Sequence, residues 1–288
     1  MRATLHLVTA DDYAAFRPAL KPVMERAVRA LGDRAEGLEL GPVLAAARDL
    51  LAVEPLAFSD LRRLLQGRFP AVNDRALGYT VRTHLPLVMV PTDARWAFPS
   101  VAGFTLADAW LGHAVPEEGS PERLVLSYLA AFGPASIVDF QTWSGLQGIA
   151  PVFARLRDEL VVFRSENGRR ELFDLPGAPR PGEDVPAPAR FLPEFDNLVL
   201  AHADRTRLVA DEHRGALVTK NLRVRATFLW DGTVAGTWET TRVRGTATLR
   251  ATAFEPLPKR ALKELTAEAE ALLRFAEDDA KAFAVELG

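Results

Sequence analysis

The densest group of side chains that could carry out chemistry lies within residues 192–207, where carboxylates and a histidine follow one another closely. Asp196, His202 and Asp204 are interleaved there with a short apolar run. A carboxylate and an imidazole held this close could act as general base and general acid. The same residues also suit a structural role, in which Asp204 pairs with Arg205 and His202 fills a polar pocket. These three side chains are therefore candidates for catalysis and for packing alike.

A second candidate site is basic and lies further along the chain. Residues 205–250 hold nine basic and four acidic side chains, a local net charge of +5 in a chain whose net charge is −3. Asp231-Gly232 is typical of a two-residue hairpin turn. If these two residues form the loop, the strands on either side pair so that Arg225 faces Trp238.

This register predicts the direction of several basic side chains. Because side chains alternate along a strand, one face of the hairpin would carry a tryptophan and four arginines: Trp238, Arg223, Arg225, Arg242 and Arg244. Four like charges on one face would attract an anionic partner, and the phosphates of double-stranded DNA are the natural one. The alternative is a solvated outer face, with internal pairs such as an arginine with Glu239.

A weaker basic signal surrounds Asn167-Gly168, another two-residue hairpin turn. The register around it pairs Arg164 with Glu171 and leaves Arg169 and Arg170 near the tip. Hairpin tips of DNA-binding domains often contact the phosphate backbone, which makes these three arginines candidates for DNA contact. A solvated hairpin is the alternative.

Other kinds of site are excluded by the motifs that the sequence lacks. The five histidines are scattered, and the sequence contains no HExxH, GxSxG, GxxxxGK[ST] or GxGxxG pattern. Cysteine is absent, which excludes disulfides and thiolate metal sites and suits a reducing cytoplasm. There is no signal peptide and no apolar run of about 18 residues, so we expect a cytoplasmic monomer without membrane contact or cofactor.

The elements that must position these side chains form an α+β fold. Residues 1–41 read as an N-terminal strand (2–8) and helices kinked near two prolines. Residues 42–118 read as three helices, the third capped by Asn73, followed by a hairpin whose return strand includes Trp96 and Phe98. This order is the winged-helix form of the helix-turn-helix. The third helix offers Arg75 and Arg82 to a DNA groove, or packs against a neighbouring unit instead.

The same order recurs in residues 119–176, with helices over 120–132, 136–143 and 148–157 and a hairpin after them. Residues 177–190 are rich in proline and glycine and read as a linker. The alternation over 191–256 predicts an antiparallel meander or a small antiparallel β-barrel, of which we expect the barrel. Residues 257–288 predict a C-terminal helix with an apolar stripe that includes Phe283.

Four phrases together resemble one family. They are residues 2–11 (RATLHLVTAD), 81–88 (VRTHLPLV) with 91–96 (PTDARW), 128–135 (YLAAFGPA) and 192–205 (LPEFDNLVLAHADR). They resemble the bacterial winged-helix DNA-binding proteins that include the alkylpurine DNA glycosylases AlkZ and YcaQ. The resemblance implies tandem winged helices with a C-terminal β-barrel. It also implies double-stranded DNA as partner and hydrolysis of the N-glycosidic bond of bulky alkylated purines, including interstrand crosslinks, in DNA repair.

One departure bears on catalysis. The resemblance implies a Gln-x-Gln or Gln-x-Asp motif in a segment ahead of the Arg-x-Thr-x-His strand, which here starts at Arg2. The glutamines of this chain, Gln66, Gln141 and Gln147, do not form that motif. We therefore expect that the chain begins inside the family's domain and binds DNA with catalysis reduced or absent. The alternatives are an active glycosylase with a non-standard catalytic group, or a transcriptional regulator or drug-binding resistance protein.

Overall fold

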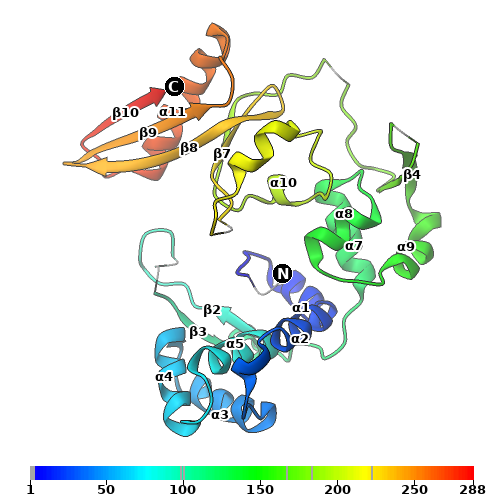
Figure 1. Ribbon diagram of the computed structural model, residues 1–288, viewed down its shortest axis with the longest axis vertical. Helices are drawn as coiled ribbons and strands as arrows, with labels where there is room; N and C mark the ends of the chain where they lie inside the picture. The colour runs from blue at the N-terminus through cyan, green and yellow to red at the C-terminus, as the bar shows by residue number, and fades with distance from the viewer. Residues whose placement is uncertain (1–3, 98, 100, 167, 183, 222) are drawn as a thin grey trace. The chain divides into compact units, whose positions relative to one another are not determined.

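The chain forms two compact units, Met1–Pro176 and Gly177–Gly288, in a computed structural model (Figure 1). The structure describes residues 4–97, 99, 101–166, 168–182, 184–221 and 223–288. Helices make up most of the first unit, and a five-stranded sheet with one long helix dominates the second. The predicted α+β class is confirmed. No helix in the described part of the chain is both long and apolar enough to cross a membrane.

Two helices, α1 (Ala10–Ala19) and α2 (Lys21–Arg29), come first in the described chain. The hydroxyl of Thr9 caps α1 by accepting a hydrogen bond from the backbone N–H of Asp12 at 3.1 Å. A proline near the start of α2 separates the two helices at Leu20, as the predicted kink requires. The strand predicted over residues 2–8 is wrong where it is described, because residues 4–9 belong to no helix or strand. A strand needs a neighbouring strand to pair with, and the described strand pairs do not include residues 4–9.

The first module, residues 40–111, consists of helices with a small sheet. It contains α3 (Leu40–Val53), β1 (Leu56–Ala57), α4 (Phe58–Arg68), α5 (Asp74–His84), β2 (Leu87–Met89), β3 (Gly103–Leu106) and α6 (Ala107–Leu111). The strand order is β1-β3-β2, so the last strand lies between the other two. Aliphatic side chains of α3, α4 and α5 form its core, with Val43, Ala47, Leu61, Leu65, Leu77 and Val81 almost fully buried.

Local signals set the limits of α5. The Asn73 side chain accepts hydrogen bonds from the N–H groups of Arg75 at 3.1 Å and Ala76 at 3.2 Å. Pro86 follows its last turn and prevents the helix from continuing. The predicted return strand is wrong, because β3 begins at Gly103 and Trp96 has a φ of 64°, outside the extended region. Phe98 lies outside the described residues.

The second module, residues 121–174, has the same order of elements. It contains α7 (Pro121–Phe132), α8 (Ile137–Ser144), α9 (Ala150–Leu156), a 3-10 turn η2 (Arg157–Glu159), β4 (Val161–Arg164) and β5 (Glu171–Asp174). Ala135, between α7 and α8, bridges Phe173 through backbone hydrogen bonds of 3.0 and 2.8 Å. The order across this sheet is therefore Ala135-β5-β4, which matches β1-β3-β2. Packed aromatic rings form its core: Tyr128, Phe140, Trp143, Phe153 and Phe173.

Helices α1 and α2 lie against both modules. Helix α2 packs on α5, and α1 packs on α7. Arg123 pairs with Asp12 at 3.1 Å, and Arg26 donates to the Gly145 carbonyl at 2.6 Å. The N-terminal helices therefore hold the two modules together within the first unit.

The second unit is built on an open sheet with the strand order β10-β9-β8-β7-β6. The antiparallel part comprises β6 (Arg190–Leu192), β7 (Thr227–Trp230), β8 (Thr233–Val243) and β9 (Thr246–Ala253). A helical turn α10 (Asn197–Leu200) and a 3-10 helix η3 (Asp211–Leu217) precede β7. The predicted closed barrel is wrong, because β6 and β10 form the two edges of the sheet and do not pair with each other.

The end of the chain also differs from the prediction. Helix α11 (Lys259–Ala276) is followed by β10 (Ala282–Leu287), which pairs in parallel with β9 (Figure 1). Phe283, Val285 and Leu287 alternate with less apolar residues and pack into the core of this unit with α11. That period of two is the pattern of a strand, and it overrides the helical stripe in which Phe283 was predicted.

Candidate nucleic-acid interface

The hairpin of β7 and β8 begins in the predicted register and then leaves it. Two pairs form as predicted beside the Asp231-Gly232 turn, and a bulge between Phe228 and Leu229 then shifts the pairing by one residue. Phe228 consequently faces Gly236. The Phe228 ring is completely buried and fills the space that a side chain at position 236 would need. Close packing of one ring against one glycine accounts for the shift.

The four arginines of the basic segment therefore lie in different local structures. Arg223 and Arg225 precede β7, where the chain folds back on itself and the Thr219 N–H donates to the Arg223 carbonyl at 2.9 Å. Arg242 lies on β8, and Arg244, with a φ of 50°, lies in the turn to β9. The prediction that all four share one face of one strand pair is wrong.

Two of these arginines are held by carboxylates. Arg223 contacts Glu194 at 2.6 Å, and Arg242 contacts Asp279 at 2.9 Å and Glu277 at 3.4 Å. These hydrogen-bonded carboxylates raise the pKa of Arg223 and of Arg242. Carboxylates of the same chain therefore offset these two positive charges at the surface.

The other two arginines, Arg225 and Arg244, are not held by described carboxylates in this way. Arg225 and Arg244 are exposed, and neither forms an ion pair with any described residue. Trp238, by contrast, serves the interior: its indole N–H donates to the Leu192 carbonyl at 2.8 Å, and its ring meets Phe191 edge-on at 5.5 Å. Of the four arginines, Arg225 and Arg244 are therefore the two whose charge no described carboxylate offsets.

The β4–β5 hairpin has the predicted register, with Arg164 opposite Glu171. The Glu171 carboxylate, however, binds Arg157, with hydrogen bonds of 2.9 and 2.7 Å. Arg157 lowers the pKa of Glu171, with a smaller contribution from Arg164. Arg164 and Arg169 are exposed on this hairpin, and Arg170 is half-buried.

Helix α5 has little free surface. Its Arg75 and Arg82 are exposed, but α2 and α4 cover most of the rest. Arg17 of α1 donates to the Thr83 carbonyl at 2.6 Å and to the Leu85 carbonyl at 3.3 Å. These carbonyls end the helix, where a cation is favourable. The packing alternative for this helix therefore fits the structure better than entry into a groove.

Sequence reasoning missed the group that anchors α5. The Tyr13 hydroxyl donates to the Leu87 carbonyl at 3.1 Å, and burial raises the pKa of Tyr13 to about 12. Burial lowers the pKa of its neighbour Arg17. The spacing of four residues on one helix was the signal that could have shown these two side chains together.

The candidates for acid–base chemistry have structural hydrogen bonds. Asp196 caps α10 by accepting the N–H two residues later at 2.7 Å. Asp204 accepts from the Thr206 hydroxyl at 2.7 Å, and the His202 carbonyl accepts from Arg205 at 3.2 Å. Within the described residues, no three His, Asp or Glu side chains gather as they would around a metal ion.

Comparison with known proteins assigns the chain to a family. A family model described as "DNA glycosylase AlkZ-like" matches residues 1–275. The chain belongs to the AlkZ-like DNA glycosylase family. The resemblance of the four sequence phrases is thereby confirmed.

Two matches from Streptomyces sahachiroi, one in sequence and one in structure, show how far the likeness extends. An interstrand DNA cross-link repair glycosylase is 30% identical over 131 residues, which span 43% of this chain and only 35% of the relative. The structure of the DNA glycosylase AlkZ matches with a TM-score of 0.65 at 23% identity, over 86% of this chain and 69% of that one. The second match establishes the AlkZ-like fold.

The glutamines of this AlkZ-like chain lie in separate elements. Gln66 is on α4, where its amide donates to the Pro70 carbonyl at 3.0 Å. Gln141 is on α8, and Gln147 follows that helix. These 288 residues contain no Gln-x-Gln sequence.

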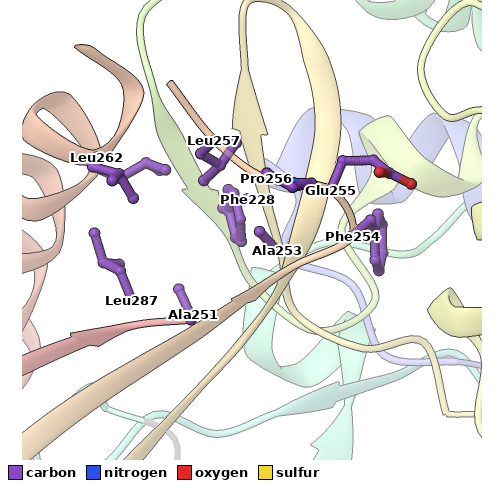
Figure 2. A pocket seen from close by; sticks show the side chains of 11 residues that line it. Phe228, Ala251, Ala253, Phe254, Glu255, Pro256, Leu257, Leu262 and Leu287 are labelled. Atoms are coloured by element: carbon purple, nitrogen blue, oxygen red, sulfur yellow. The ribbon is translucent and has the colours of Figure 1, made fainter. Parts of the chain in front are cut away.

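The second unit also contains an apolar cavity of about 330 Å³, lined by residues of the sheet and α11. Figure 2 shows Phe228, Leu257, Leu262 and Leu287 around it, with the Glu255 carboxylate turned away from the leucines. Hydrolysis would need a positioned acid and base, and the lining supplies one outward carboxylate. The cavity is a gap in the packing of α11 on the sheet and does not suit catalysis.

Proposed function

We propose that this chain binds double-stranded DNA and that its two modules are winged-helix forms of the helix-turn-helix. The observation that carries the proposal is the repeated topology. In each module a helix, a short strand or bridge, two helices and a hairpin follow in order, and the last strand lies in the middle of the sheet. That arrangement is typical of helix-turn-helix DNA-binding domains with a wing. Membership in the AlkZ-like family supports the same partner.

Phosphate contacts in the second unit come from Arg225 and Arg244, which form no ion pair with a described residue. The β4–β5 hairpin of the second module adds further candidates, Arg164, Arg169 and Arg170, because Arg164 and Arg169 are exposed there. Arg223 and Arg242 contribute less, because their charges are balanced by Glu194 and Asp279. Such contacts position a protein on the duplex without reading its sequence.

Excision by this chain alone is reduced or absent in this proposal. Hydrolysis of an N-glycosidic bond needs a group that holds water against the sugar carbon and stabilises its developing positive charge. Asp196 and Asp204 are the carboxylates nearest to that description, and both already accept structural hydrogen bonds. In each of them the Oδ1 atom already accepts a local hydrogen bond that fixes the side chain.

Two assays on one substrate test the proposal. A labelled duplex carrying alkylated purines is titrated with protein to measure binding, and it is then treated with alkali, which cuts the strand wherever a base has been excised. We expect saturable binding and little scission. Absence of binding at low salt would overturn the proposed function. Extensive scission that Asp196→Asn or Asp204→Asn abolishes would show an active glycosylase with a non-standard catalytic group.

A further inference from the structure

The loop between β2 and β3 presents a tryptophan to solvent in an unusual conformation. The Trp96 side chain is 56% exposed, and its φ of 64° lies in the left-handed region. The next residue, Ala97, has a φ of 61°. Residues with side chains rarely adopt this conformation, and two in succession are rarer still.

Hydrogen bonds hold the loop in this shape. The Thr92 N–H donates to the Ala97 carbonyl at 2.7 Å, and the Ala97 N–H donates to the Ala94 carbonyl at 2.8 Å. The Ala94 N–H donates to the Thr92 hydroxyl at 3.2 Å. These three hydrogen bonds support the strained conformation of residues 92–97. Strain of this kind collects where a protein contacts a ligand.

A cation accompanies the exposed ring. The Arg95 guanidinium carbon lies 5.5 Å from the centroid of the Trp96 ring. The loop thus offers a flat aromatic surface and a positive charge together. A nucleobase with its flanking phosphate has the complementary chemistry, since bases stack on aromatic rings and phosphates bind arginine.

We propose that this loop enters DNA where base stacking is interrupted, with Trp96 stacking on the exposed base and Arg95 near the flanking phosphate. The inference rests on the proposed function and extends it from the duplex to a damaged or unstacked site. Apolar and aromatic wedges inserted at a base step are a known way to hold a distorted duplex. The loop lies at the hairpin of the first module, which is the part of a winged helix that approaches DNA.

The test compares two duplexes of the same sequence, one intact and one with a one-nucleotide gap. Trp96→Asn removes the ring while keeping a residue that tolerates a left-handed backbone. Trp96→Phe keeps an aromatic ring, and Trp110→Ala is the control, because Trp110 is 50% exposed on α6, outside the loop.

We expect the wild-type chain to bind the gapped duplex more tightly than the intact one. Trp96→Asn should reduce affinity for the gapped duplex roughly tenfold, as expected for one base–aromatic stack, and leave the intact duplex unchanged. Trp96→Phe should keep most of the preference and lose the quenching of tryptophan fluorescence on gapped DNA. Trp110→Ala should match the wild type.

The inference is overturned if the wild-type chain binds the gapped and intact duplexes equally well, or if Trp96→Asn keeps the preference for the gapped duplex. In either case, binding of the intact duplex would leave the proposed function standing. In that case the loop suits a protein partner instead. If the wild type binds neither duplex, the proposed function fails, and this inference fails with it.

Discussion

The clearest consequence of the structure is that the four arginines of the second unit should not be equivalent in DNA binding. Arg225 and Arg244 are exposed and form no ion pair with a described residue, whereas Arg223 and Arg242 are held by carboxylates. The perturbation is a pair of double variants with the same loss of charge. One is Arg225→Gln with Arg244→Gln, and the other is Arg223→Gln with Arg242→Gln.

The magnitude follows from the release of counterions. Each phosphate contact adds about 0.9 to the slope of log affinity against log salt, so a lost contact costs about eightfold at roughly 0.1 M salt. The double variant of Arg225 and Arg244 should therefore lose about sixtyfold in affinity and about 1.8 in slope. The double variant of Arg223 and Arg242 should keep its slope and change affinity by about twofold, because screening limits the effect of distant charge.

The assay is fluorescence anisotropy of a labelled duplex, titrated with each variant at several salt concentrations. Circular dichroism shows whether both variants are folded. Equal losses of slope in the two double variants would refute the reasoning. They would show that Arg223 and Arg242 contact phosphates as strongly as Arg225 and Arg244 do, despite their ion pairs with carboxylates of the same chain. An unchanged slope in both would remove this surface from the interface.

Further predictions concern stability. Unfolded Tyr13 loses its proton near its ordinary pKa of 10.0 and the folded residue near about 12, so stability should fall as pH rises through this window and Tyr13→Phe should abolish the fall. Arg17→Met leaves two carbonyls at the end of α5 without their donor, and the free energy of unfolding measured in urea should fall by roughly 2–3 kcal/mol. An unchanged free energy of unfolding would contradict the capping role of Arg17. Gly236→Ala brings a methyl group into the Phe228 ring and the backbone opposite, and should destabilise the second unit by more than about 3 kcal/mol in urea unfolding. Gly215→Ala is the control and should leave stability unchanged, because a methyl group there meets no atom within 4 Å. An unchanged stability of Gly236→Ala would disprove the explanation of the bulge.

Sequence reasoning succeeds where a local interaction decides the structure. The predicted cap at Asn73 depends on neighbours within three residues, and the structure confirms it. The cap at Thr9 and the end of α5 before Pro86 are decided by equally local interactions. The register of the β4–β5 hairpin was predictable for the same reason, because a tight turn determines the pairing of its strands.

Contacts between distant parts of the chain explain the failures. The bulge in β7 depends on the Phe228 ring over Gly236, which no local pattern shows. The strand β10 forms because β9 offers it a free edge, although the same residues extend a helical stripe.

The candidate site shows the same limit. Composition shows the basic segment around Arg225, but the structure was needed to show that Glu194 and Asp279 hold two of its arginines. Both carboxylates lie more than 25 residues from their partners in the sequence, so no window of neighbouring residues contains the pair.

The measurement that tests the account most directly is the affinity of the unmodified chain for an undamaged duplex over a range of salt concentrations. Binding through phosphates predicts a tight complex at low salt and a straight, steeply falling line of log affinity against log salt. A chain that does not bind duplex at low salt, or whose affinity does not change with salt, would contradict the claim that this AlkZ-like protein is a DNA-binding protein.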